Sequence, residues 1–165
     1  LRLKLIGAVR EAEPAIAALD AIAVAQKILD RVLFIAFAED TDLLPENTLS
    51  QAFITRDPYN PRPVWDNFRG LFNAIDKGSD ALKIPRYNGG LFHQDDTINS
   101  LILHNDVCEG FKALGEYDFA SEVSVTVLGH IFEQSIADVE RLQAQARGEE
   151  TEEVKASGTT GRRKR

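Results

Sequence analysis

The sequence predicts an all-α fold, an irregular bundle of about five to six helices joined by long loops. The first reason is that apolar residues recur at three- and four-residue steps, the spacing of a buried helix stripe. One such stripe comprises Val24, Ile28, Val32 and Ile35. The second reason is that prolines stand between these segments, at positions 14, 45, 58, 61, 63 and 85. At 165 residues the chain is long enough to bury a core.

The N-terminal third predicts one short and one central helix. Residues 1–13 can form a helix that Pro14 interrupts. The second helix runs from Ala15 to about Phe37, and its richness in alanine, isoleucine, leucine and valine is typical of a buried position. The acidic residues Glu39, Asp40 and Asp42 follow this helix, and Pro45 prevents its continuation.

In the middle of the chain, the sequence predicts a short helix, then a loop, then a longer helix. Asn47 or Thr48 is a suitable cap for a helix that continues through Phe53. Three prolines make residues 55–63 a loop. A further helix is predicted from Val64 to Lys77, with Gly78 as its C-terminal stop.

Residues 79–100 are the most loop-like interior segment. Asn88-Gly89-Gly90 favours a tight turn, and a small hairpin near residues 84–98 is one option. A helix is expected at Asp106–Leu114. The last helix has an apolar face between Val127 and Val139, with Ser121 or Ser124 as its cap.

We expect two regions, a helical domain at residues 1–148 and a charged, Gly/Ser/Thr-containing linker at residues 149–165. The sequence starts at a leucine and shows no signal peptide, so we expect it to begin inside a longer protein. No apolar run is long enough to span a bilayer.

Charge and cysteine usage narrow the function classes. The net charge of −7 argues against a freestanding nucleic-acid binder, which normally carries a basic excess. A single cysteine excludes a disulfide framework within this chain and fits a cytoplasmic compartment. Cys108 lies among acids without an adjacent base, so we expect it to pack and not to react. The three histidines show no metal-ligand spacing.

Two loops mix arginine with aromatic residues, and they are the candidate contact sites. One carries Arg56 and Arg62 on either side of Tyr59, and the other carries Arg86, Tyr87 and Asn88. Such loops can touch phosphate or a neighbouring domain. Alternatively, Tyr87 and Phe92 pack onto the helices while the arginines are merely solvated. We expect no catalytic, cofactor-binding or metal-binding residue in this chain.

Three segments carry a resemblance to a known family. Ala25–Asp40, followed by Leu43-Leu44-Pro45, resembles a helix in the connector of type IIG restriction–modification enzymes, which precedes their methyltransferase domain. Ile84–Phe92 is similar to the loop that follows this helix. Leu128–Ser135 is similar to the long helix that leads toward the methyltransferase domain. The three segments stand in the family's order, and the resemblance spans about residues 20–145.

The resemblance implies more than the chain contains. The longer parent protein would bind S-adenosylmethionine and methylate adenine in DNA. A nuclease domain could precede residue 1. The basic stretch Arg162, Arg163, Lys164 and Arg165 looks like the family's lead-in to the methyltransferase and is a further candidate for DNA contact. The chain's partners would be those neighbouring domains and, through the parent, DNA.

Three hypotheses for function follow. The first is a helical scaffold or connector that positions the catalytic modules of a DNA modification enzyme. The second is a helical protein-interaction module of an unrelated cytoplasmic protein, which would present an exposed apolar patch or groove. The third, an independent enzyme, would need converging polar groups, with His93, Asp95, Asp96 and Arg86 as first candidates.

Overall fold

The computed structural model describes residues 1–87, 89–122, 126–127 and 129–130. Seven α-helices and one 3-10 helix lie in these residues: α1 (Arg2–Ala12), α2 (Ala18–Asp40), α3 (Thr48–Ile54), α4 (Val64–Lys77), η1 (Gly90–Phe92), α5 (Asp96–Ser100), α6 (Asn105–Leu114) and α7 (Phe119–Glu122). The part of the chain that is described contains no strand, and its one β-bridge joins Ser79 to Ile84. The predicted all-α class is therefore confirmed.

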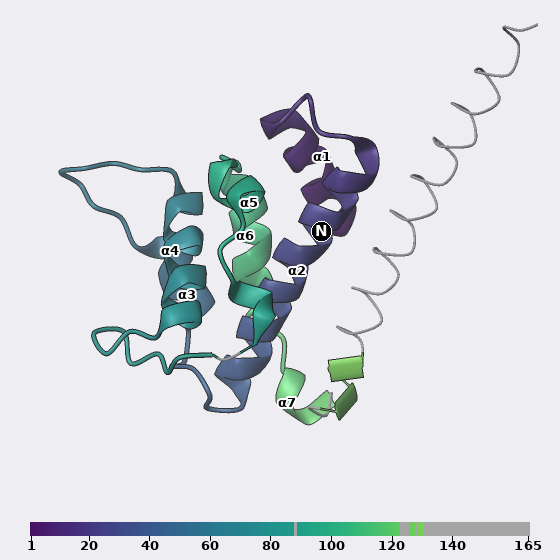
Figure 1. The fold of residues 1–165 in the computed structure, drawn as a ribbon. Coiled ribbons are helices and arrows are strands. Elements are labelled where there is room, and N and C mark those ends of the chain that lie inside the picture. The colour runs from purple at the N-terminus through teal and green to yellow at the C-terminus, as the bar shows by residue number, and fades with distance from the viewer. Residues whose placement is uncertain (88, 123–125, 128, 131–165) are drawn as a thin grey trace, which may run out of the picture.

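The long helix α2 is the axis of the bundle. It contacts α1, α3, α5, α6, α7 and η1, and Figure 1 shows it running through the molecule with α1 beside its first half. Three residues of the predicted stripe, Ile28, Val32 and Ile35, are each at 0% exposure, and the fourth, Val24, is partly buried against the core. A helix that contacts neighbours all around explains why this segment is apolar on more than one face.

Aromatic side chains fill the space between α4, α6 and the 3-10 helix. Phe68 of α4 lies 5.3 Å from Phe111 of α6, centroid to centroid. Trp65 lies 5.9 Å from Phe72, at an edge-to-face angle of 77°. Such pairs are typical of a well-packed aromatic core. Helix α4 has the predicted limits, and Gly78 follows it with a φ of 79°.

The interior segment at 79–100 differs from its prediction. The hairpin considered near residues 84–98 is not formed among the described residues, because η1 and α5 occupy that stretch. The sequence signal for α5 is Asp95, whose side chain accepts a hydrogen bond from the Ile98 N–H at 3.1 Å. This is an N-cap on a helix of only five residues, too short for a periodic apolar pattern.

Two neighbouring carboxylates at the end of α2 cap two other helices. Glu39 Oε1 accepts a hydrogen bond from the Leu49 N–H at 2.6 Å, in the first turn of α3. Asp40 Oδ2 accepts one from the Phe119 N–H at 2.7 Å, at the start of α7. The expected cap residue of α3, Asn47, makes no side-chain cap, so the cap comes from α2 instead. These bonds join three helices at one point.

The predicted C-terminal features fall largely beyond the described residues. Ser121 lies inside α7, and Asp118 accepts a hydrogen bond from its N–H at 3.2 Å. Ser124, most of the apolar face between Val127 and Val139, and the linker at 149–165 are outside the described residues. The division at residue 148 therefore stays a prediction.

Glu39 makes stability depend on pH. Burial raises its pKa to about 7, although the Leu49 hydrogen bond acts in the opposite direction. The ordinary value is 4.5, so between these two values the folded state holds more protons than the unfolded state. Stability therefore falls as pH rises through this window.

We expect Glu39→Gln to match the wild type at about pH 4.5 and to exceed its free energy of unfolding at about pH 8, by up to roughly 3 kcal/mol. The amide oxygen keeps an acceptor for Leu49 and removes the buried charge. Urea unfolding across this pH range measures the difference. Glu46→Gln, at an exposed carboxylate in the next loop, is the control. Parallel pH profiles for wild type and Glu39→Gln would contradict the assignment.

Candidate contact loops

The loop after α4 is part of the core at its aromatic positions. The Tyr87 ring lies 4.7 Å from Phe34 of α2 and 5.7 Å from Phe92, centroid to centroid. Phe92 is 1% exposed. Arg86 is exposed and makes no hydrogen bond or ion pair with the described residues. The rings of Tyr87 and Phe92 therefore pack onto the helices, with Phe92 buried and Tyr87 half-buried, while Arg86 is exposed.

A buried arginine that the sequence analysis did not single out holds this loop to α2. Arg31 is 2% exposed. Its Nε donates to the carbonyl oxygen of Leu91, and its Nη2 donates to that of His93, both at 2.8 Å. The guanidinium carbon lies 5.2 Å from the centroid of Phe72 and 5.7 Å from that of Phe92. The planar guanidinium of Arg31 thus donates to two loop carbonyls while it packs against two aromatic rings.

Two carboxylates at longer range offset part of the cost of burying the Arg31 charge, and the pKa of Arg31 remains lowered. Burial lowers the pKa of its guanidinium, and the charges of Asp95 and Asp76 raise it. Each carboxylate has its own closer partner. Asp95 Oδ2 lies 2.9 Å from Lys27 Nζ, and Asp76 Oδ1 lies 3.0 Å from His93 Nδ1. Arg31 is therefore stabilised by the two carbonyls and by the charges of Asp95 and Asp76, and no described carboxylate forms a direct salt bridge with it.

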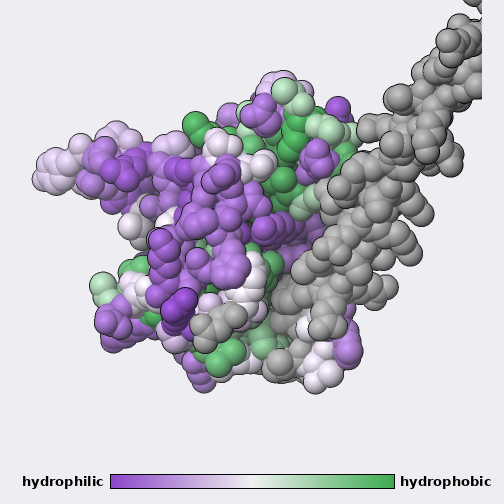
Figure 2. All heavy atoms as spheres, in the orientation of Figure 1, coloured by the Kyte–Doolittle hydropathy of each residue, from purple (hydrophilic) through white to green (hydrophobic). Residues whose placement is uncertain are grey.

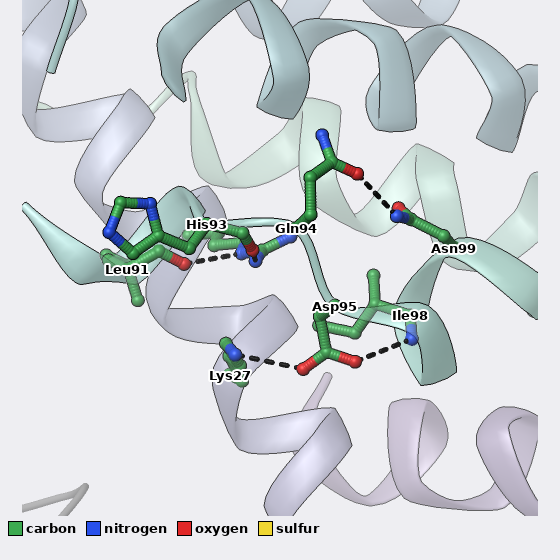
Figure 3. A network of polar contacts seen from close by, with 8 residues as sticks. Lys27, Leu91, His93, Gln94, Asp95, Ile98 and Asn99 are labelled. Carbon is green, nitrogen blue, oxygen red and sulfur yellow. Dashed lines mark hydrogen bonds and ion pairs between the residues drawn. The ribbon is translucent and has the colours of Figure 1, made fainter. Parts of the chain in front are cut away.

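The candidates for an independent active site are distributed over separate structural contacts. Figure 3 shows Asp95 between Lys27 of α2 and the Ile98 N–H, while His93 lies away from it. Burial acts to raise the pKa of Asp95, but hydrogen bonds from Lys27 and Ile98 outweigh it and the pKa is lowered. His93 is paired with Asp76 instead. These groups hold α2, α4 and α5 together, and no shared reaction centre results.

The other predicted loop stands away from the body. Residues 54–63 are all exposed, and Figures 1 and 2 show the segment between α3 and α4 projecting from the rest of the molecule. Tyr59 is 95% exposed, the highest value among the exposed large hydrophobic residues. The two loops are thus opposite in character, one integrated into the core and one projecting.

The arginines of the projecting loop form hydrogen bonds within the loop and with the end of α3. Arg56 donates to the carbonyl oxygens of Phe53 and Thr55, which end α3. Arg62 donates to the Asn60 side-chain oxygen from Nε at 3.2 Å and from Nη2 at 2.8 Å, in the amide orientation that satisfies both groups. Asp57 accepts hydrogen bonds from the backbone N–H groups of Tyr59 and Asn60. Such contacts brace the loop.

The remaining candidates lie elsewhere. Asn88 and the basic stretch Arg162, Arg163, Lys164 and Arg165 are outside the described residues. Cys108 is fully buried, and burial raises the pKa of its thiol to about 12, so its predicted packing role is confirmed. Within the described ranges, no three His, Cys, Asp or Glu side chains are grouped to hold a metal ion. Nor does any helix there have the length and apolarity to cross a membrane.

A comparison with protein families gives one match. Residues 24–92 match the family model described as MmeI, helicase spacer domain, a region of a type IIG restriction enzyme. The matched residues run from α2 to η1, and they contain Arg31, its carbonyl partner Leu91 and the projecting loop. No curated protein and no solved structure matches the chain. The resemblance to type IIG enzymes is therefore supported for residues 24–92.

Arg31 should be far more important for stability than its exposed neighbours. We expect Arg31→Met to lower the free energy of unfolding by about 2–4 kcal/mol, because two carbonyls lose a charged donor. Arg31→Lys should recover only part of this, since an ammonium does not reproduce the fork. Arg86→Met, in the same loop, is the control and should change stability by less than about 0.5 kcal/mol. Urea unfolding distinguishes these values, and equal effects at the two arginines would refute the role of Arg31.

Proposed function

We propose that this chain is a helical spacer in a type IIG-like restriction–modification enzyme, where it holds catalytic modules at a fixed separation. The observation that carries the proposal is the family match over residues 24–92, in which the buried polar contacts of Arg31 and Glu39 lie. The parent would be cytoplasmic, would use S-adenosylmethionine to methylate adenine in DNA, and would carry a methyltransferase module after this chain and a nuclease module before it.

The construction of the bundle suits this role. A helix of 23 residues is about 34 Å long. Helix α2 is tied to α3 through Glu39, to α7 through Asp40 and to the 84–93 loop through Arg31. Directional bonds at three places along one rigid rod keep its neighbours from rotating about it. A flexible linker of the same length would not transmit a defined distance.

A protein-interaction module is the second candidate. It is favoured by a groove of about 510 Å³ between α3 and α4, whose lining includes Ala52, Gly70, Leu71 and Leu82. Polar side chains, among them Glu46, Asp66 and Asn67, line the same groove, so it would accept an amphipathic helix or an extended segment with both apolar and polar side chains. On the spacer proposal this surface would receive a neighbouring module of the same enzyme.

The spacer proposal is tested by separating two activities of the full-length enzyme. Arg31→Met and Glu39→Ala loosen α2 at different places, so a shared effect would come from lost rigidity. We expect both variants to methylate DNA at nearly the wild-type rate and to cleave it at least about tenfold more slowly or at scattered positions, because methylation would need the methyltransferase module alone whereas cleavage would need the nuclease module held at a fixed distance from it.

Arg86→Met is the matched control and should leave methylation and cleavage unchanged. Unaltered cleavage in both loosened variants, with the expected fall in their stability, would refute the spacer proposal. Equal loss of methylation and cleavage would also count against it, because that pattern indicates general unfolding.

The isolated chain should bind duplex DNA weakly and mainly through its basic end. Removing residues 157–165 takes away four of the 19 Lys and Arg residues and no acid, so the net charge changes from −7 to −11. We expect this truncation to abolish binding in fluorescence anisotropy at low salt, and binding by the complete chain to fall steeply as salt rises. Tight binding that survives the truncation would contradict the expectation.

A further inference from the structure

The short helix α7 is held together by contacts between neighbours in the sequence. Asp118 directly precedes the helix and accepts a hydrogen bond from the Ser121 N–H at 3.2 Å. The ring centroids of Tyr117 and Phe119 lie 6.2 Å apart. Because both contacts are local, they are kept wherever the helix lies relative to the bundle. Helix α7 can therefore move as a unit without losing its own cap.

The contact of α7 with the bundle is made at the end of α2. Helix α7 packs against α2, and Figure 1 shows it at that end of the molecule, apart from α1, α4 and α5. Asp40 Oδ2 accepts a hydrogen bond from the Phe119 N–H at 2.7 Å. The Phe119 side chain is partly buried against the core. A carboxylate that accepts from a backbone N–H makes a strong hydrogen bond, so Asp40 contributes much of the force that keeps α7 in place.

A glycine brings the connection before α7 close to α3. A Cβ atom at Gly115 would lie 3.2 Å from Leu49 Cδ1 and 3.3 Å from the carbonyl oxygen of Lys112. The φ angle of Gly115 is −65°, which any residue adopts, so the small space beside Leu49 is what favours glycine here. Leu49 is fully buried, and its N–H is the one that donates to Glu39. The end of α6 is thus packed on the same residue that Glu39 caps.

These contacts form a closed path that begins and ends on two adjacent residues of α2. The path runs from Asp40 to Phe119, back along the connection to Gly115, across to Leu49, and through the Leu49 N–H to Glu39. If α7 leaves α2, the connection at residues 115–118 moves with it and the contact between Gly115 and Leu49 weakens. Coupling between distant groups is carried by such continuous packing and hydrogen bonding.

We propose that Asp40, Leu49 and Gly115 form a latch that holds α7 on α2 and couples the release of α7 to the loosening of α3. While the latch is closed, α7 leads the chain away from the bundle in one direction. When the latch opens, α7 turns about residues 115–118 as a unit that keeps its Asp118 cap. The latch itself does not depend on the proposed spacer function. Its consequence, a single orientation for a module that follows, rests on that function.

Amide hydrogen exchange of the 165-residue chain, measured by NMR, tests the latch at single residues. In Asp40→Ala we expect the Phe119 N–H to exchange at least about tenfold faster, because it loses its acceptor. The Leu49 N–H should exchange at least about threefold faster, although it keeps Glu39, because the latch couples the two sites. The Val32 N–H, in the buried middle of α2, should be unchanged and reports on global unfolding.

Two further variants control this experiment. Asp40→Asn keeps an oxygen acceptor for the Phe119 N–H and should retain most of the protection. Glu46→Ala removes an exposed carboxylate from the loop that follows α2 and should leave exchange at Phe119 unchanged.

Gly115→Val tests the same coupling from the opposite side. The added methyl groups need the space that Leu49 occupies, so we expect faster exchange at both the Leu49 and the Phe119 N–H, with Asp40 still in place. Gly7→Val is the matched control, because Gly7 is exposed and a Cβ atom there meets nothing within 4 Å. It should alter neither amide.

A distance measurement shows whether α7 moves. Spin labels are attached at Lys77→Cys and Ser121→Cys, which are exposed positions at the end of α4 and on α7. Cys108 does not compete for the label, because it is buried and its thiol pKa is raised to about 12. We expect one narrow distance distribution in the labelled protein with Asp40, and a broader one or a second distance with Asp40→Ala.

Several outcomes would overturn the proposal. Faster exchange at Phe119 alone in Asp40→Ala, or at Leu49 alone in Gly115→Val, would show that the two sites are not coupled. Equal acceleration at Val32 would show general unfolding and no latch. A single unchanged distance in Asp40→Ala would show that α7 stays docked without this hydrogen bond.

The two proposals fail in different ways. Unchanged exchange and distance in Asp40→Ala, with scattered cleavage by Arg31→Met in the full-length enzyme, would retain the spacer and remove the latch. The expected exchange and distance changes, with unaltered cleavage by Arg31→Met, would retain the latch and remove the spacer function.

Discussion

The buried guanidinium of Arg31 is the contact on which the arrangement of the bundle depends. It lies near the middle of α2 and donates to two carbonyls of a loop 60 residues further along the chain. The Leu91 carbonyl lies in the three-residue 3-10 helix and the His93 carbonyl directly follows it, so no α-helical ladder is available to satisfy either one. Because the charge is buried, the site tolerates it only with its donors satisfied and with Asp76 and Asp95 near enough to offset part of the desolvation.

At the end of α2, side chains again satisfy backbone groups of other segments, but here they supply hydrogen-bond acceptors and not donors. Glu39 and Asp40 supply acceptors to the N-terminal N–H groups of α3 and α7, which have no partner within their own helices. One helix therefore satisfies unpaired backbone groups of three other segments, with donors at Arg31 and acceptors at Glu39 and Asp40. Apolar packing alone would leave these segments free to slide, because dispersion and hydrophobic contacts lack direction. The polar contacts select one arrangement.

The body of the bundle and the projecting loop use their polar groups in different ways. At the 84–93 loop, the polar contacts of Arg31, Asp76 and His93 serve the internal structure, whereas Arg86 is exposed. The 54–63 loop has the opposite organisation, since its internal hydrogen bonds stiffen the backbone and leave Tyr59 outside. The family match covers both.

The sequence by itself determined the fold class, the limits of α4 and the buried stripe of α2, because these follow from local periodicity and from glycine and proline. It also raised the packing of Tyr87 and Phe92 as an alternative, without choosing between that and a contact site. The tertiary structure decided that choice, and it also decided the role of Arg31, the caps from Glu39 and Asp40, and the short helix α5. Each of these depends on atoms that are close in space and far apart in sequence, or on too few residues to make a period. Arg31 had one local sign, an ionisable side chain within an apolar helix, but only the folded chain brings Leu91 and His93 to it.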